Sequence, residues 1–239
     1  MQRDKSIDIA KALGIIMVVM CHANFAPMAP FRYFHMALFF FLSGWLSSFQ
    51  QPIWIFIKNK LRHLYLPFVV AELVFLLLHT TVFEHIGMSV PHTLPMPELL
   101  LRIALFDNVE VMLAPLWFMP ALFFATIISY ALVNLTRRRQ KTMFAISLVL
   151  MLLGLVCEHF SWAELPSLYF SKGIGVILVA QFFCCLGYML RQTHFHFDKW
   201  QIALAALVYL YVARLFLHLS VDMRVNHYRS EERRVGKEC

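Results

Sequence analysis

Long apolar stretches, separated by short charged or proline-containing segments, dominate the chain. A helix needs about 20 apolar residues to cross a bilayer, and seven stretches approach that length: 7–25, 33–50, 64–84, 115–135, 142–158, 173–190 and 200–219. The pattern predicts an all-α, polytopic transmembrane helical bundle with no room for a separate soluble domain. A shorter apolar piece, IWIFI at 53–57, is too short to span, and we expect it to lie at the membrane interface.

Composition supports this class and excludes others. Of the 239 residues, 60% are hydrophobic and 15% are charged, whereas soluble domains contain about 25% charged residues. The cysteines at 21, 157, 184 and 185 lie in or beside apolar stretches without zinc-type spacing, which is typical of buried thiols. Nucleic-acid binding would need basic residues gathered on a soluble face, and the pattern offers none.

Basic residues predict the orientation in the membrane. With a cytoplasmic N-terminus, the inner segments hold eleven Lys and Arg residues: Arg3, Lys5, Lys58, Lys60, Arg62, Arg137, Arg138, Arg139, Lys141, Arg191 and Lys199. The outer segments hold three: Arg32, Arg102 and Lys172. By the positive-inside rule we expect a multi-pass protein of the inner (plasma) membrane with its N-terminus in the cytoplasm.

The last eleven residues, 229–239, differ from the rest of the chain. They read RSEERRVGKEC and follow an apolar stretch without a turn signal. They resemble the conceptual translation of a sequencing adapter, and such scars are set aside before the fold is considered. We therefore expect a membrane domain at 1–228 and an adapter-derived tail at 229–239.

A charge inside a membrane span is costly and by default marks a site. Four candidates inside the predicted spans stand out: Lys11, His22, Glu72 and Arg214. Lys11 and His22 are eleven residues apart, which places them on one helical stripe about 16 Å apart along the axis. Separately, each could be an interfacial residue, with Lys11 paired to Asp8. Their shared stripe favours a functional site. Glu72 could pair with a basic residue or bind substrate.

Two motifs near the N-terminus resemble the acyltransferase 3 family of integral membrane acyltransferases, which includes fucose 4-O-acetylase-like and O-antigen acetylase-like enzymes. A basic residue, ten positions and a histidine match Lys11 and His22, and His-Met-x-x-Phe-Phe-x-x-Ser-Gly matches His35 to Gly44. A basic run ending in Leu and Pro, and Pro-Leu-Trp-Phe, match more weakly at 58–67 and 115–118.

The resemblance implies specific roles and also shows two departures. It implies that His22 and Lys11 are catalytic and that His35, Lys58, Lys60, Arg62 and Trp117 bind substrate. Glu72 joins the substrate-binding candidates because of its charge inside a span. The family usually carries two arginines three apart in the basic run, where this chain has Lys60 and His63, and Arg and Lys are not interchangeable on phosphate. The family module has about ten helices, of which a chain of this length holds about seven, so we expect a C-terminally truncated module.

These residues suit transfer of an acyl group from a thioester to a hydroxyl. A neutral imidazole at His22 would accept the hydroxyl proton, while Lys11 and the basic cluster 58–62 would attract the phosphates of a cytoplasmic acyl-CoA. We expect an O-acyltransferase that uses acyl-CoA, with acetyl-CoA as donor substrate, no bound cofactor, and a saccharide or lipid-linked saccharide acceptor. A transporter with a Lys11, His22 and Glu72 path, or a helical scaffold, remains an alternative.

The remaining candidates suggest structural roles. His79, His85 and His92 lack helical metal spacing and flank a proline-containing outer loop, so we expect surface histidines and no metal site. Ser43 and Gly44 lie within a helix, which predicts close helix packing and not a nucleophile.

Overall fold

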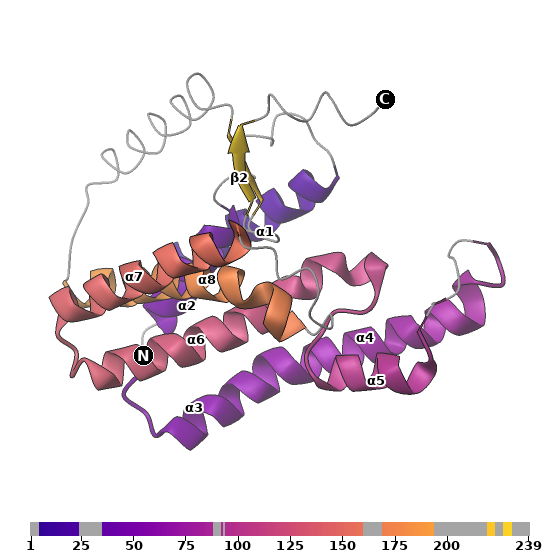
Figure 1. Ribbon diagram of the computed structural model, residues 1–239, viewed down its shortest axis with the longest axis horizontal. Helices are drawn as coiled ribbons and strands as arrows, with labels where there is room; N and C mark the ends of the chain where they lie inside the picture. The colour runs from indigo at the N-terminus through magenta and orange to yellow at the C-terminus, as the bar shows by residue number, and fades with distance from the viewer. Residues whose placement is uncertain are drawn as a thin grey trace.

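The apolar stretches fold into helices because a backbone surrounded by lipid must satisfy its hydrogen bonds within each segment. A computed structural model describes residues 5–23, 35–87, 92, 94–159, 169–193, 219–222 and 227–230. Five predicted spans coincide with helices: α1 (Lys5–His22), α2 (His35–Leu46), α6 (Phe118–Leu135), α7 (Gln140–His159) and α8 (Tyr169–Gln192) (Figure 1). The span predicted at 200–219 lies outside the described residues apart from its last position.

One continuous helix, Ile53–Phe83, contains the third predicted span. It consists of α3 (Ile53–Lys60), the π-helical turn η2 (Leu61–Tyr65), α4 (Leu66–Leu78) and a second π-helical turn, η3 (His79–Phe83). The piece 53–57 is the start of this helix, and its predicted place at the membrane interface stays a prediction. Pro67 would interrupt a regular helix, and the wider turn η2 just before it lets the helix continue.

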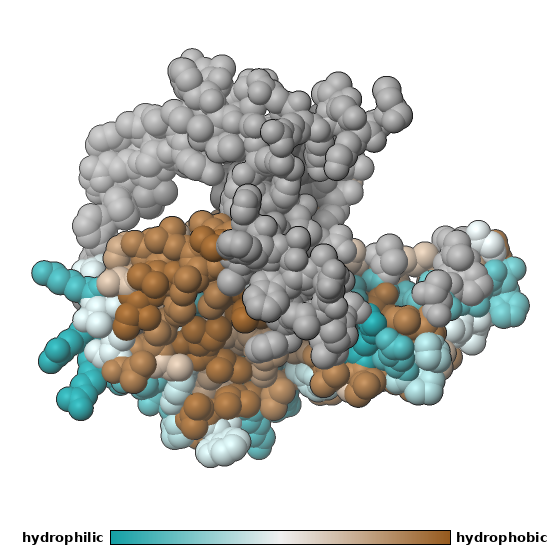
Figure 2. All heavy atoms as spheres, in the orientation of Figure 1, coloured by the Kyte–Doolittle hydropathy of each residue, from teal (hydrophilic) through white to brown (hydrophobic). Residues whose placement is uncertain are grey.

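The bundle carries the surface expected of a membrane protein. Among the described residues, three helices are long and apolar enough to cross a bilayer, Ile53–Phe83, Met112–Leu135 and Gly173–Gln192. Two shorter ones, Met36–Leu46 and Gln140–Val156, are also apolar. Figure 2 shows a broad hydrophobic surface over α6, α7 and α8, with hydrophilic side chains at the end where α6 turns into α7. Such an exposed apolar surface suits contact with lipid. The chain is a helical membrane bundle.

Helix α8 lies at the centre of the bundle and packs against α2, α6 and α7. A Cβ atom added at Gly44 would overlap the backbone carbonyl of Cys184, and one at Gly187 would overlap that of Phe41. The close packing predicted for Gly44 is thus confirmed, since only a residue without a side chain lets the two backbones approach.

Buried polar groups link the same helices. The Gln181 side-chain amide on α8 donates to the Ser147 carbonyl on α7 at 2.9 Å, and the Ser129 hydroxyl on α6 contacts the Gln181 carbonyl at 3.3 Å. Arg191 donates to the Trp45 carbonyl on α2 at 2.9 Å. Hydrogen bonds of this kind supplement van der Waals packing between membrane helices.

Two elements were not predicted between the long helix and α6: α5 (Met96–Ala104) and the 3₁₀ helix η4 (Val111–Trp117). Helix α5 is amphipathic, and its Leu99 and Ile103 are buried against Phe68 and Leu76 of the long helix. It was missed because it is too short to span. A two-stranded antiparallel hairpin, β1 (Leu219–Asp222) and β2 (His227–Ser230), is the one departure from all-α structure among the described residues.

Candidate functional site

A cavity of about 540 Å³ lies between α1, α2, α3 and α6. Its lining comprises Lys11, Ile15, Phe39, Leu42, Ser43, Leu46, Ser47, Ser48, Gln51, Phe56, Lys60, Phe118 and Leu122. The volume falls within the range of small-molecule sites, about 300–1,000 Å³. We call this cavity the cationic pocket, because two of the predicted basic residues line it.

Lys11 and Lys60 reach the cationic pocket from different elements. Lys11 comes from α1, and Lys60 is the last residue of α3. The Lys60 ammonium lies 5.3 Å from the centroid of the Phe56 ring, which is a cation–π distance. Lys58 and Arg62 of the predicted cluster are exposed and are absent from the pocket lining. Two ammonium groups in one cavity favour an anionic ligand.

The rest of the lining divides into polar and apolar parts. Ser43, Ser47 and Gln51 supply hydroxyl and amide groups near the end of α2, and the Ser47 hydroxyl donates to the Ser43 carbonyl at 2.6 Å. Phe39, Leu42, Leu46, Phe118 and Leu122 supply the apolar part. A largely apolar lining with a few polar groups is typical of ligand sites.

Helices α1 and α2 pack closely at Gly14, where an added Cβ atom would lie 2.9 Å from the Phe39 ring. Lys11 and Ser43, which line the pocket, lie on one side of this contact. His22 ends α1 and His35 begins α2, so their backbones lie on the other side, because successive spans run in opposite directions. One continuous α1 confirms that Lys11 and His22 share a helix. The side chains of His22 and His35 lie outside the described residues, and their catalytic and binding roles stay predictions.

Glu72 lies away from the cationic pocket. Its side chain is fully buried, and Oε2 accepts the backbone N–H groups of Val109 and Glu110 at 3.2 and 3.1 Å. These bonds hold the segment before η4 against the long helix. The arrangement weakens the alternative of a transport path through Lys11, His22 and Glu72. Arg214, the other charge in a predicted span, lies outside the described residues.

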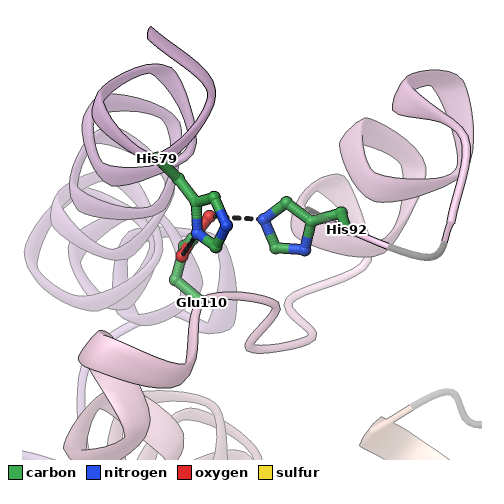
Figure 3. A group of neighbouring side chains, drawn as sticks. All are labelled: His79, His92 and Glu110. Atoms are coloured by element: carbon green, nitrogen blue, oxygen red, sulfur yellow. Dashed lines mark hydrogen bonds and ion pairs between the residues drawn. The ribbon is translucent and has the colours of Figure 1, made fainter. Parts of the chain in front are cut away.

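His79 and His92 lie together with Glu110, and none of the three lines the pocket. His79 Nδ1 is 3.0 Å from Glu110 Oε2, and His92 Nε2 is 2.9 Å from Glu110 Oε1 (Figure 3). The prediction that His79 lies on the surface is wrong, since it is only 7% exposed. It is buried because the helix continues to Phe83 and the side chains of His92 and Glu110 lie against it. His85 is exposed, as predicted.

A family model described as an acyltransferase domain, acyltransferase 3, matches residues 4–231. The chain belongs to the acyltransferase 3 family. No curated protein and no solved structure matches it. The family makes this protein a membrane acyltransferase, as the motifs at Lys11–His22 and His35–Gly44 indicated.

Other residues of the acyltransferase 3 motifs separate into pocket and packing positions. Phe39 and Ser43 line the cationic pocket, whereas Phe40 is buried in the core. Trp117 packs against the core cluster that contains Phe40 and is absent from the pocket lining. Its predicted contact with substrate stays a prediction.

Several residues of the cationic pocket, and Glu110 beside His79 and His92, were not predicted from the sequence. Ser47 and Gln51 lie in the turn after α2, where no motif marks them, and Glu110 lies between α5 and η4. For Glu110 a signal existed: an acidic residue in an apolar context, VEVML.

Proposed function

We propose that this membrane acyltransferase moves an acyl group, acetyl in the simplest case, from acyl-CoA to a hydroxyl of an envelope or exported saccharide. The observation that carries the proposal is the meeting of Lys11 and Lys60 in one cavity. Coenzyme A bears a diphosphate and a further phosphate, and paired ammonium groups attract such a polyanion. The apolar part of the lining suits the uncharged arm of the donor.

The proposed chemistry uses His22 as the general base. Its imidazole takes the proton of the acceptor hydroxyl as the oxygen attacks the thioester carbonyl. The carbon–sulfur bond then breaks, the ester forms, and the departing thiolate takes up the proton to give free coenzyme A. Lys11 lies about 16 Å from His22 along α1, so the donor would extend from its phosphates near Lys11 to its thioester near His22.

The proposed orientation places the cationic pocket on the cytoplasmic side of the inner membrane, where acyl-CoA is available. Lys60 and His79 are nineteen residues apart on one continuous helix, which corresponds to about 28 Å. That length matches the hydrocarbon thickness of a bilayer, about 30 Å. The pocket and the histidine side of the long helix therefore suit opposite membrane faces.

The catalytic proposal is tested with His22→Ala in protein expressed in its membrane. Loss of a positioned base typically lowers a rate by about 10²- to 10⁴-fold, so incorporation of labelled acetyl from acetyl-CoA into envelope saccharide should fall by that order. The matched control is His85→Ala, since His85 is an exposed histidine outside the pocket. Undiminished transfer by His22→Ala at wild-type membrane levels would exclude His22 as the base.

The orientation is tested separately with reporter fusions. The exposed run Arg137, Arg138 and Arg139 should lie in the cytoplasm because basic loops are retained there. Alkaline phosphatase fused after Gln140 should be inactive, and a fusion after Asn108 should be active. The reverse pattern would overturn the cytoplasmic position of the pocket.

A further inference from the structure

Two imidazoles and one carboxylate converge at a place that the acyl-transfer chemistry does not use. His79 comes from η3 at the end of the long helix, His92 from the following loop, and Glu110 from the segment before η4. One ligand atom from each side chain lies within 4.8 Å of the others. The two imidazole ring centroids are 4.1 Å apart. We call these three residues the histidine cluster.

We propose that the histidine cluster binds a divalent transition-metal ion, with zinc as the ion that fits best. Zinc takes imidazole nitrogen and carboxylate oxygen ligands, and three protein ligands leave one position for water. In a tetrahedral site with bonds of about 2.0–2.2 Å, the donor atoms lie about 3.4 Å apart. The three donors lie within 4.8 Å of one another, so side-chain rotations that bring them closer would complete the site.

Charge supports a cation at this position. Glu110 is 1% exposed and Glu72 is fully buried, and the two are adjacent because Glu72 accepts the Glu110 backbone N–H. The recorded side-chain partners of Glu110 are the two histidines, and Oε1 of Glu72 has no hydrogen-bond partner among the described residues. Burying two carboxylates without compensating charge is costly. A divalent ion would supply that charge while both imidazoles stay neutral.

A further carboxylate, that of Glu84, lies beside the proposed ligand His79. His79 turns Nδ1 towards Glu110, and its other ring nitrogen, Nε2, lies 3.7 Å from Glu84 Oε1. Metal-binding histidines commonly direct their second nitrogen to a carboxylate, which fixes the ring orientation. Glu84 is therefore placed to orient His79 towards the ion.

A bound ion would join three segments of the chain. It would link the end of the long helix to position 92 and to the segment before η4, closing two loops that otherwise cost conformational entropy. The expected consequence is a metal-dependent increase in stability of this region. Because the readouts are metal content and stability, this proposal stands or falls independently of the acyl-transfer proposal.

The first test measures zinc in protein purified in detergent without chelators. We expect about one zinc ion per chain, and Co²⁺ exchanged into the site should give the visible absorption of a tetrahedral site. Glu110→Gln and His92→Ala should each lose the ion and the spectrum. His85→Ala is the matched control, since it removes an exposed histidine of the same region and should retain the ion.

A second test needs no substitution and covers the case in which the variants fail to fold. Wild-type protein stripped with EDTA should have a lower Tm, and added zinc should restore it, because an ion that binds only the folded state stabilises that state. A stripped protein that takes up no zinc and keeps its Tm would overturn the proposal. Equal zinc loss in His85→Ala and His92→Ala would also overturn it, since it would show adventitious binding.

Discussion

The two ends of the long helix Ile53–Phe83 carry polar groups in contrasting states. Near one end, Lys60 lies in the cationic pocket, with no ion pair recorded for it among the described residues. Towards the other end, the Glu72 carboxylate is buried and accepts backbone N–H groups. Beside it, the buried carboxylate of Glu110, from the segment before η4, contacts the histidines. A substrate pocket keeps its charges available for a large ligand, whereas the buried carboxylates are held by backbone amides and imidazoles, an arrangement that suits a small ion.

The largest effect is a loss of stability, which we expect when the buried carboxylate of Glu72 is removed. Glu72→Ala removes the acceptor for the Val109 and Glu110 N–H groups and leaves both without it. Hydrogen bonds to a charged group contribute about 1.5–3 kcal/mol each, so the free energy of unfolding should fall by about 3 kcal/mol or more. A thermal unfolding curve in detergent measures this loss.

The control for that variant is Glu72→Gln, which keeps a carbonyl acceptor and should lose less stability. In both variants the KM for the acyl-CoA donor should stay at its wild-type value, because Glu72 does not line the cationic pocket. If Glu72→Gln kept the wild-type Tm but raised a substrate KM, Glu72 would be a binding residue and the contrast between the two ends would fail.

A smaller effect, confined to substrate use, is expected at the pocket end. Lys60→Ala removes one of the two ammonium groups that line the cavity. A charge-assisted contact of about 1.5–3 kcal/mol corresponds to about a 10- to 100-fold rise in donor KM. Steady-state kinetics over a range of acetyl-CoA concentrations measures it.

Lys11→Ala should act in the same direction, and Lys11→Arg should retain much of the activity because it keeps the positive charge.

The matched control is Lys58→Ala, which removes an exposed lysine outside the pocket lining on the same helix. Its donor KM should change little, because exposed charges are screened by water and salt. Equal effects of Lys58→Ala and Lys60→Ala would indicate a diffuse surface field and not a defined pocket.

The pocket end could be predicted because its signals are local in the sequence. Lys11 and His22 repeat at a helical period, and Ser43 and Gly44 fall in a compact motif on one helix. Apolar length alone likewise located most of the helices. Lys60 was expected among three basic residues, but its difference from Lys58 and Arg62 depends on which side of the helix faces α1 and α2, and that emerges only on packing.

The histidine cluster could not be predicted in this way. His79, His92 and Glu110 come from three separate segments, with α5 between the last two, so their approach depends on tertiary packing and follows no sequence period. The spacing rules that exclude helical metal sites do not apply to ligands from three segments. The continuity of the helix from 53 to 83 was missed for a related reason, since a π turn before Pro67 leaves no mark in the apolar pattern.

The smallest expected effect comes from Tyr65, which lies on the same helix between the two ends. Its hydroxyl donates to the Ala104 carbonyl at 2.7 Å and so ties α5 to η2, while its ring packs edge-to-face on Phe106 at 5.1 Å. Tyr65→Phe keeps the ring contact and removes one neutral hydrogen bond, which should cost about 0.5–1.5 kcal/mol of unfolding free energy. The measurements are the Tm and the donor KM of the variant.

A lower Tm with an unchanged KM would show that the α5 region can loosen without disturbing the cationic pocket. A raised KM would instead show that the two ends are coupled through the helix they share.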